Sequence, residues 1–401
     1  MSCCAGDGLI SVEQALERLL GQAQPLQEVE RVPLASARGR VLAKPLVTEI
    51  DLPPWPNSAM DGYAIRYAEA DVPLPVSQKI FAGTAPEPLQ PGTCARIFTG
   101  APVPAGADAV EMQENTELLD EQRVRFLQPI KPGQHIRPQG GEARCGDVML
   151  PAGTVIGPFE LGLAASIGAG SLEVIRRPRV ALLSTGDELI EPGHALGAGQ
   201  IYNSNRYLLA AWLERLGCEV IDAGVLCDDL EAVKQRLGSL AGADLILSTG
   251  GVSVGEADFL GQALRAAGDI AFWKLAIKPG KPLTFGHYEG TPVIGLPGNP
   301  ASTLVTFGML ARPYLLRRMG VAQVAPLGFE VPIGFDWPKP GTRREYLRAR
   351  LEGGVAVLYA NQSSSVLRGA AWAHGLVEIR EGSTLRERDT ATFIPFSELL
   401  G

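Results

Sequence analysis

The sequence predicts a multi-domain protein of mixed α/β and β class. We expect a central open α/β domain with a mainly parallel sheet, flanked by β-rich domains and a C-terminal β-barrel-like domain. The 401 residues exceed the roughly 100–200 residues of one domain. Short apolar runs broken by Pro and Gly fill residues 27–176 and return after Pro326, which is typical of strands with long loops. From Pro178 strand-like and helix-like segments alternate, which predicts helices on both faces of a parallel sheet.

Composition excludes several classes of protein. Hydrophobic residues make up 46% and charged residues 20%, as in folded domains. The net charge of −8, with no dense basic stretch, argues against nucleic-acid binding. No apolar stretch approaches the roughly 20 residues that span a bilayer, and no secretory signal is visible, so we expect a cytoplasmic protein without a membrane partner. The six cysteines form no zinc-like pattern with the four histidines, and we expect mostly buried free thiols.

Local signals place the helices. Ser11 and Gln14 form a capping-box pattern, and Gly21 ends that helix. Pro158 opens a helix inside the β-rich region. In the alternating region, we expect Ser204 to cap a helix through Leu216 and either Asp228 or Asp229 to cap the next. Two further helices are expected over about 257–267 and from Pro300 to Met319, and strands over the ranges 180–184, 219–226, 244–248, 270–276 and 293–296.

Three loops follow strands of the predicted sheet and are rich in Gly, Ser, Thr and carboxylates. They are Ser184-Thr-Gly-Asp187-Glu188, the segment 248–258, and Leu296-Pro-Gly-Asn-Pro300 with Ser302 in the helix that follows. Carboxyl ends of parallel strands are the usual ligand site of an open α/β sheet, and glycine lets backbone N–H groups approach an anion. One such loop alone would favour a tight connection, whereas three favour an anion site.

Acidic residues beside an anion site would repel it unless a divalent cation bridges the two. Asp258 and Glu188 are therefore candidate Mg²⁺ ligands. Asp187 and Asp228 fit helix caps or solvated acids equally well. In the β-rich region Asp61 and Thr99 lie in polar turns, and physical chemistry alone gives no preference between turn-capping and catalysis.

A cluster of lysines follows a strand in the segment Lys274-Leu-Ala-Ile-Lys278-Pro-Gly-Lys281-Pro. Pro and Gly restrict the backbone there, and ammonium groups suit phosphate or another oxyanion. A solvated basic loop would explain one lysine more easily than three. Strand alternation would also place Arg344, Arg348 and Arg350 on one face, although most would be surface arginines if considered alone.

Several strings together resemble the molybdopterin molybdenumtransferase (MoeA) family, which is related to the E domain of gephyrin. They occur in the family's order along nearly the whole chain. The strings are Pro53-Pro-Trp-Pro-Asn-Ser-Ala-Met-Asp-Gly-Tyr-Ala64, Ile97-Phe-Thr-Gly-Ala-Pro-Val-Pro104, Leu183-Ser-Thr-Gly-Asp-Glu-Leu189, Ile201-Tyr-Asn-Ser-Asn205, Ser248-Thr-Gly-Gly-Val-Ser-Val-Gly255, Lys278-Pro-Gly-Lys-Pro-Leu283 and Leu296-Pro-Gly-Asn-Pro300.

The resemblance implies an enzyme that inserts molybdate into adenylylated molybdopterin with Mg²⁺, releasing AMP and molybdenum cofactor. It also implies an elongated homodimer and a molybdopterin adenylyltransferase as upstream donor. The implied domains are a pterin-nucleotide-binding α/β domain (1–26 and 177–325), a linking domain (27–45 and 147–176), a β-rich domain that closes the partner's active site (46–146) and a C-terminal β domain (326–401).

Site residues carry over by motif. Asp258 and Glu188 would hold or orient Mg²⁺ and the phosphates, Lys274 and Lys278 would face the phosphoanhydride, and Asp61 and Thr99 would come from the partner subunit. The molybdate site would comprise Lys281, Ser302, Arg348 and Ser364. The remaining substrate-binding residues would be Thr185, Gly186, Asp187, Ser204, Asp228, Gly250, Gly251, Ser253, Pro297, Gly298 and Asn299.

The chain departs from the family pattern in places. Ala143 stands where an acid often follows Gly-Glu, so that role is missing or moved to Asp147. Ser363-Ser-Ser365 replaces an expected Gly-Ser-Gly turn, and Ala373-His-Gly375 replaces Ala-Asn-Gly.

Three competing hypotheses are that the chain is the related adenylyltransferase, a scaffold or an inactive paralogue. The adenylyltransferase carries Thr-Gly-Gly-Thr-Gly, whereas this chain has Thr249-Gly-Gly-Val-Ser253. A gephyrin-like scaffold or an inactive paralogue that binds a partner peptide would not need a metal-and-anion site.

Overall fold

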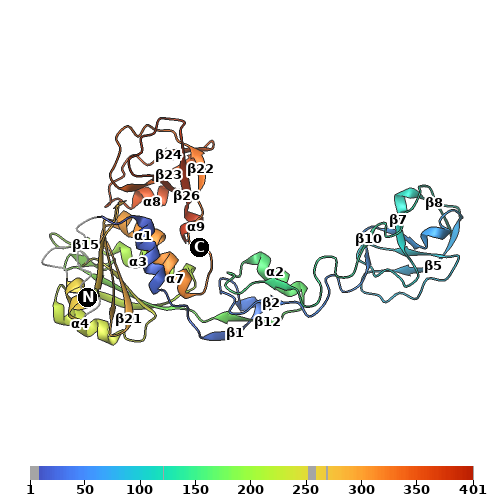
Figure 1. Cartoon of the computed structure of the whole chain (residues 1–401), viewed down its shortest axis with the longest axis horizontal. Helices are drawn as coiled ribbons and strands as arrows, with labels where there is room; N and C mark the ends of the chain where they lie inside the picture. Colours follow the sequence, from blue (N-terminus) through green and yellow to red (C-terminus); the bar gives the residue numbers. More distant parts are fainter. Residues whose placement is uncertain (1–8, 121, 252–258, 268–269, 401) are drawn as a thin grey trace. The chain divides into compact units, whose positions relative to one another are not determined.

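The computed structural model describes residues 9–120, 122–251, 259–267 and 270–400 (Figure 1). The chain divides into two compact units, which are considered separately below. The first comprises Met1–Ala43, Gly153–Gly157 and Leu172–Gly401, and the second comprises Lys44–Ala152 and Pro158–Ser171. No helix among the described residues is long and apolar enough to cross a membrane. The candidate Asp258 and Ser253 lie outside the described residues.

A six-stranded mixed sheet forms the centre of the first unit, in the order β16-β13-β17-β21-β20-β18. The four strands from β16 to β21 pair in parallel, as predicted, and β20 and β18 add an antiparallel edge. The strands are β13 (Arg179–Thr185), β16 (Glu219–Leu226), β17 (Leu245–Thr249), β18 (Ile270–Lys274), β20 (Pro282–Tyr288) and β21 (Thr291–Leu296).

Strand β20 is not among the strands predicted from the sequence. Its turn to β21 consists of Glu289 and Gly290, both with positive φ (47° and 81°). Two central residues with positive φ are typical of a hairpin turn whose twist matches that of the strands. Glu is an unusual residue at such a position, so the local sequence carried only half of the usual hairpin signal.

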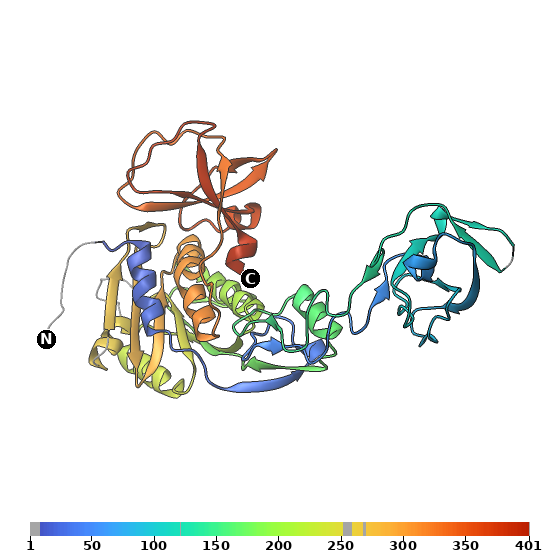
Figure 2. The same ribbon diagram turned by 45° about the vertical axis from the view of Figure 1, so that its right-hand side comes forward.

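Helices cover both faces of this sheet, as predicted. On one face lie α1 (Val12–Gln22), α3 (Ser204–Arg215), α6 (Pro300–Thr306), the π turn η4 (Phe307–Ala311) and α7 (Arg312–Arg318). Helix α1 packs against α7 although the two are far apart in sequence (Figures 1 and 2). The opposite face carries α4 (Leu230–Ser239) and α5 (Phe259–Ala266).

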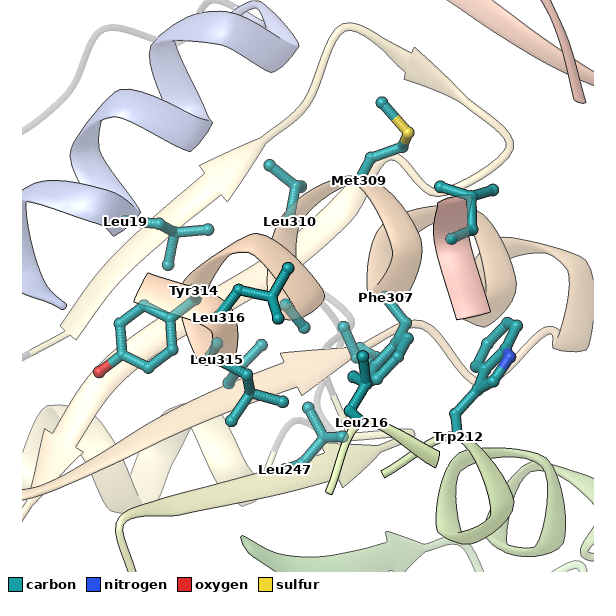
Figure 3. Packing of buried hydrophobic residues seen from close by; sticks show 14 of the residues in the cluster. Leu19, Trp212, Leu216, Leu247, Phe307, Met309, Leu310, Tyr314, Leu315 and Leu316 are labelled. Atoms are coloured by element: carbon teal, nitrogen blue, oxygen red, sulfur yellow. The ribbon is translucent and has the colours of Figure 1, made fainter. Parts of the chain in front are cut away.

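The larger core lies under the first set of helices. Figure 3 shows Leu19 of α1 and Tyr314 of α7 among residues of this cluster, and the ring of Trp212 beside that of Phe307. The last two rings stack with centroids 5.1 Å apart. The helix predicted from Pro300 to Met319 is interrupted by the π turn, just before Pro313, which lacks the N–H that a regular helix would use.

Helix caps follow the sequence with one correction. Ser11 and Gln14 form the predicted capping box, and Asp229, one of the two candidates, caps α4. The cap of α3 is Asn203, not Ser204, because the Asn203 side chain accepts a hydrogen bond from the backbone N–H of Arg206 (3.3 Å). Ser204 is therefore the first helical residue.

The C-terminal part of the first unit is a second six-stranded sheet. Its order is β19-β23-β25-β26-β22, and β24 pairs with β23. A bridge between Ile333 and Ala356 joins the segment after β22 to β24, so the sheet curls on itself in the barrel-like manner expected. The elements are β19 (Ile277–Lys278), β22 (Phe329–Pro332), β23 (Arg344–Glu352), β24 (Val355–Leu358), β25 (Gly375–Ile379), β26 (Thr390–Pro395), α8 (Arg368–Trp372) and α9 (Phe396–Leu400).

Smaller elements complete the two units. In the first, β1 (Val29–Pro33) pairs with β12 (Ser171–Ile175), and β14 (Leu189–Ile190) pairs with β15 (Ile201–Tyr202). The second unit is β-rich, as predicted, with a six-stranded sheet in the order β7-β4-β6-β5-β9-β8. Its elements are β2 (Leu46–Val47), β3 (Asn57–Ser58), β4 (Gly62–Ile65), β5 (Leu74–Ile80), β6 (Cys94–Ile97), β7 (Ala109–Met112), β8 (Thr116–Leu118), β9 (Arg123–Phe126), β10 (Ile136–Arg137), β11 (Val148–Leu150) and α2 (Pro158–Ser166).

Candidate active site

A cavity of about 900 Å³ opens in the first unit where the carboxyl ends of β17 and β21 meet the C-terminal sheet. Its walls combine two glycine loops, the lysine segment and the curled sheet. The lining residues are Gly250, Gly251, Lys274, Lys278, Pro279, Gly280, Lys281, Pro282, Pro297, Gly298, Asn299, Ser302, Trp337, Arg343, Glu345, Tyr346, Leu347, Gln362, Ser363 and Ser364. Cavities of this size accommodate a drug-sized ligand.

The glycines that end β17 pack against the end of β13. A Cβ added at Gly250 would lie 2.5 Å from the backbone oxygen of Thr185, and one added at Gly251 would lie 2.7 Å from the Thr185 hydroxyl oxygen. Both glycines also have positive φ (85° and 63°). Because any side chain would clash and strain the backbone there, these glycines are required for the two loops to meet.

The loop after β21 is held from two sides. The Thr303 hydroxyl donates to the Pro297 carbonyl (2.6 Å), and the Asn205 side chain donates to the Gly298 carbonyl (2.7 Å). Ser302 is 4% exposed and lines the cavity. Asn205 lies in one of the motifs above, but no role could be predicted for it because its contact with Gly298 spans 93 residues of sequence.

The structure brings the three predicted lysines to one cavity. Lys274 ends β18, Lys278 lies on β19, and Lys281 follows Gly280, whose φ of 113° and close approach to Thr306 exclude a side chain. The N–H of Leu275 donates to the carbonyl of Lys281 (2.7 Å), which closes the segment into a loop. The lysines are therefore held by backbone contacts at the cavity wall.

Two charged residues of the cavity had no role in the sequence analysis. Arg343 lines the wall and donates to the Ile277 carbonyl (3.3 Å). Glu345 is 6% exposed and pairs with Lys278 (Nζ–Oε2 3.0 Å). Register across β19 and β23 places this pair side by side, and neither strand alone carries a signal for it.

Of two residues assigned to the molybdate site by motif, Ser364 lines the cavity and Arg348 does not. Ser364 lines the cavity, and its carbonyl accepts a hydrogen bond from the N–H of Ala301 (2.9 Å). Arg348 is not among the lining residues. Its buried guanidinium donates to the carbonyls of Ser363 (3.1 Å) and Val366 (2.7 Å), so it holds the loop that forms the wall. Burial lowers the pKa of Arg348.

The acidic candidates form a second group, separate from the cavity lining. Asp187 and Glu188 are exposed after β13, and the N–H of Asp228 donates to Asp187 Oδ1 (3.1 Å). Burial raises the pKa of Asp228, and the charges of Asp187 and Glu188 raise it further. The Glu188 carboxylate lies against Gly186. The three carboxylates are therefore close enough to repel one another.

Polar atoms without partners gather near these strand ends. Among the described residues, none accepts from or donates to the Thr185 hydroxyl, Asn203 Nδ2 or Asn205 Oδ1, although all three atoms are buried. Unsatisfied buried polar groups are rare and mark places where a ligand or water completes the hydrogen bonding. Ser204 is half-buried at the start of α3.

In the second unit the structure brings Asp61 and Thr99 together. The backbone N–H and the hydroxyl of Thr99 both donate to Asp61 Oδ1 (2.7 and 2.8 Å). These two bonds lower the pKa of Asp61, with the backbone donor contributing most. The carboxylate is exposed and remains ionised at neutral pH.

The cysteine expectation is correct for only two of the four cysteines described. Cys94 and Cys218 are buried, and burial raises the pKa of each thiol to about 12. Cys145 and Cys227 are exposed free thiols, because each lies in a loop rather than on a buried strand.

Comparison with known proteins places this site in a family. Three family models match: "MoeA N-terminal region (domain I and II)" over residues 10–168, "Probable molybdopterin binding domain" over 181–317 and "MoeA C-terminal region (domain IV)" over 330–396. The chain is 38% identical to the molybdopterin molybdenumtransferase of Haemophilus influenzae, over 98% of this chain and 100% of that protein. It is 39% identical to molybdopterin molybdenumtransferase 2 of Mycobacterium tuberculosis, over 87% and 90%.

The fold agrees with this relationship. The crystal structure of the molybdopterin biosynthesis MoeA protein from Pyrococcus horikoshii OT3 superposes with a TM-score of 0.84 at 30% identity, covering 97% of this chain and 100% of that one. The family models together reach from the first helix to the last strand. The chain therefore belongs to the MoeA family of molybdopterin molybdenumtransferases, enzymes of molybdenum cofactor biosynthesis.

Proposed function

We propose that this chain inserts molybdenum from molybdate into adenylylated molybdopterin in a Mg²⁺-dependent reaction that releases AMP and molybdenum cofactor. The observation that carries the proposal is the cavity itself. Lys274, Lys278, Lys281 and Arg343 converge on it beside the glycine loops. Such a concentration of cations suits a substrate with several phosphate oxygens and an oxyanion co-substrate.

Different lining residues bind the molybdate and the phosphates of the nucleotide. Lys281 and the buried Ser302 supply an ammonium group and a hydroxyl for molybdate, and Ser364 lines the same cavity. Lys274 and Lys278 supply positive charge for the phosphates. Arg348 does not contact the anions in this proposal. It holds the 361–366 loop of the cavity wall by donating hydrogen bonds to backbone carbonyls.

The acidic group fits a magnesium ion by its donor chemistry. No three acidic, histidine or cysteine side chains of the described residues are arranged so that they could hold a metal ion together. Mg²⁺ does not require such a group, because it is commonly bound through one or two carboxylates together with substrate phosphates and water. Glu188, with Asp258, would hold the ion, which when bound would neutralise charge on the phosphates.

In the proposed step a molybdate oxygen attacks the adenylyl phosphorus. The bond from that phosphorus to the pterin's phosphate oxygen breaks. The bond between the attacking oxygen and molybdenum then breaks as the dithiolene sulfurs bind the metal, so AMP keeps that oxygen and the pterin keeps the molybdenum with its three other oxygens. Lys274 and Lys278 stabilise the negative charge that develops on the phosphoryl oxygens. The fixed lysine segment means that little reorganisation is needed at that moment.

The proposal extends to assembly and context. We expect a cytoplasmic homodimer in which Asp61 and Thr99 of the partner subunit complete the site. We also expect a molybdopterin adenylyltransferase as donor of the substrate, and neither a nucleic acid nor a membrane as partner. The domain boundaries proposed from the sequence, at residues 26, 45, 146, 176 and 325, belong to the same proposal.

The test uses the purified full chain with adenylylated molybdopterin, molybdate and Mg²⁺. AMP release and molybdenum incorporation are followed for the wild type and for Asp258→Ala. Release that depends on molybdate and disappears in the variant supports the proposal. Tight nucleotide binding without molybdate-dependent turnover contradicts it and favours an inactive paralogue or a scaffold, for which a peptide partner unaffected by Asp258→Ala would be expected.

A further inference from the structure

The anion cavity contains a buried carboxylate. Among the described residues that line it, Glu345 is the one acid, against the cations Lys274, Lys278, Lys281 and Arg343. A negative charge in such a place weakens the binding of an anion, so a carboxylate there calls for a specific task. What Glu345 contacts therefore indicates what that task is.

Glu345 is held in place by its strand. Glu345 lies on β23, where it is the register partner of Lys278 of β19 on one side and of Ile379 of β25 on the other. Its carboxylate contacts the Lys278 ammonium group at 3.0 Å, and the Glu345 side chain is 8% exposed whereas that of Lys278 is 52% exposed. The acid is thus a fixed partner for a lysine that reaches into the open cavity.

Gly341 shapes the other side of the carboxylate. A Cβ added at Gly341 would lie 2.9 Å from Glu345 Oε1, and the φ of this glycine is not in the left-handed region. An alanine is therefore compatible with the backbone at this position, but its Cβ would displace the Glu345 carboxylate. Glu345 is confined between Gly341 and Lys278.

The ion pair divides the cations of the cavity into two kinds. Lys278 is paired, whereas Lys274 and Lys281 form no ion pair with any acid in the described part of the chain. A small oxyanion that enters the cavity meets, at Lys278, an ammonium group that is already paired with a carboxylate. The stronger attraction lies toward the two lysines that are unpaired within the described residues, of which Lys281 follows Gly280, whose Cβ position lies 3.5 Å from the Ser302 carbonyl oxygen.

We propose that Glu345 is a positioning residue that reserves Lys278 for the phosphates of the nucleotide substrate. By holding the ammonium group at the cavity wall, it directs the inorganic oxyanion to the Lys281 side. This inference rests on the proposed function, because it assigns the two anions to different parts of the same cavity.

The test measures sulfate and molybdate binding to the full chain by isothermal titration calorimetry, without pterin substrate. Glu345→Gln should tighten sulfate binding about fivefold, the size expected for release of a partly exposed ion pair. In a Lys278→Met background the same substitution should change the Kd less than about twofold, because the effect acts through Lys278. Glu345→Asp should remain close to wild type.

A second variant makes the test independent of the charge change. Gly341→Ala keeps the carboxylate but crowds it, and should also tighten sulfate binding, by less than Glu345→Gln does. Thermal unfolding of each variant identifies any that fails to fold, and if Glu345→Gln fails, Gly341→Ala carries the test.

Three outcomes would overturn the inference: unchanged sulfate binding in Glu345→Gln, weaker binding, or an effect that persists fully in Lys278→Met. A wild type that binds neither sulfate nor molybdate would instead contradict the proposed function of the cavity. The two failures are therefore distinguishable.

Discussion

Two groups of strand-end loops on the same sheet differ in the charged residues that lie beside them. The neighbouring strands β16 and β13 end in Asp228, Asp187 and Glu188, whereas β17 and β21 end in glycine loops that open into the lysine-lined cavity. The sheet order sets the acidic loops beside one another and the glycine loops beside one another. A metal ion and anionic ligands can therefore be bound at neighbouring strand ends of the same sheet.

The largest expected effect comes from removing charge in the cavity. Lys281→Met keeps much of the stem and loses the ammonium group, so molybdate-dependent AMP release should fall by about 10²–10³-fold. Steady-state assays of AMP release measure this. The matched control is Lys234→Met on α4, where the lysine pairs with Glu231 (2.7 Å) outside the cavity. A similar loss in both variants would show that the cavity has no special role.

The glycine loops provide the next test. Gly250→Ala combines positive φ with a contact of 2.5 Å to the Thr185 backbone oxygen. We expect the free energy of unfolding to fall by about 2–3 kcal/mol. Gly242→Ala is the control, because Gly242 has a φ of 92° but nothing within 4 Å. It should cost only about 1 kcal/mol of backbone strain. Equal losses in urea unfolding would contradict the close approach of the two loops.

Separate binding of Mg²⁺ and of molybdate tests whether the acidic loops and the lysine-lined cavity act independently. Glu188→Gln should weaken Mg²⁺ binding about tenfold, as loss of a ligating carboxylate does, and leave molybdate binding unchanged. Lys281→Met should do the reverse. Thermal shifts with each ligand separately measure both effects, because a ligand that binds the folded state stabilises it. Loss of both responses in either variant would mean that the two groups form one inseparable site.

The smallest effect concerns the repulsion within the acidic group. The raised pKa of Asp228 means that the folded state binds more protons than the unfolded state between the ordinary and the raised value, so stability falls as pH rises through that window. Asp228→Asn should therefore stabilise the metal-free protein at pH 7 by a few tenths of a kcal/mol after solvent screening. The gain should vanish below about pH 4. Urea unfolding at both pH values, with the exposed Asp71→Asn as control, would contradict this if the gain were independent of pH.

The class of the fold and most of its elements follow from the amino-acid sequence alone. Apolar runs that alternate with capped helices specify β–α–β units, since burial of one face per element admits few arrangements. Ser11 and Asp229 set their helices through contacts within four residues. The lysine segment could also be recognised, because Pro and Gly at fixed spacing restrict the backbone wherever it lies.

The set of residues that share the cavity follows from contacts between distant parts of the chain. Glu345 meets Lys278 through strand register, Asn205 at the start of α3 contacts Gly298 in the loop after β21, and Arg348 donates to backbone carbonyls instead of lining the cavity. The antiparallel edge through β20 likewise depends on a turn whose glutamate has positive φ. These contacts join residues far apart in the chain, and their energy comes from register and burial that exist only once the sheets are assembled.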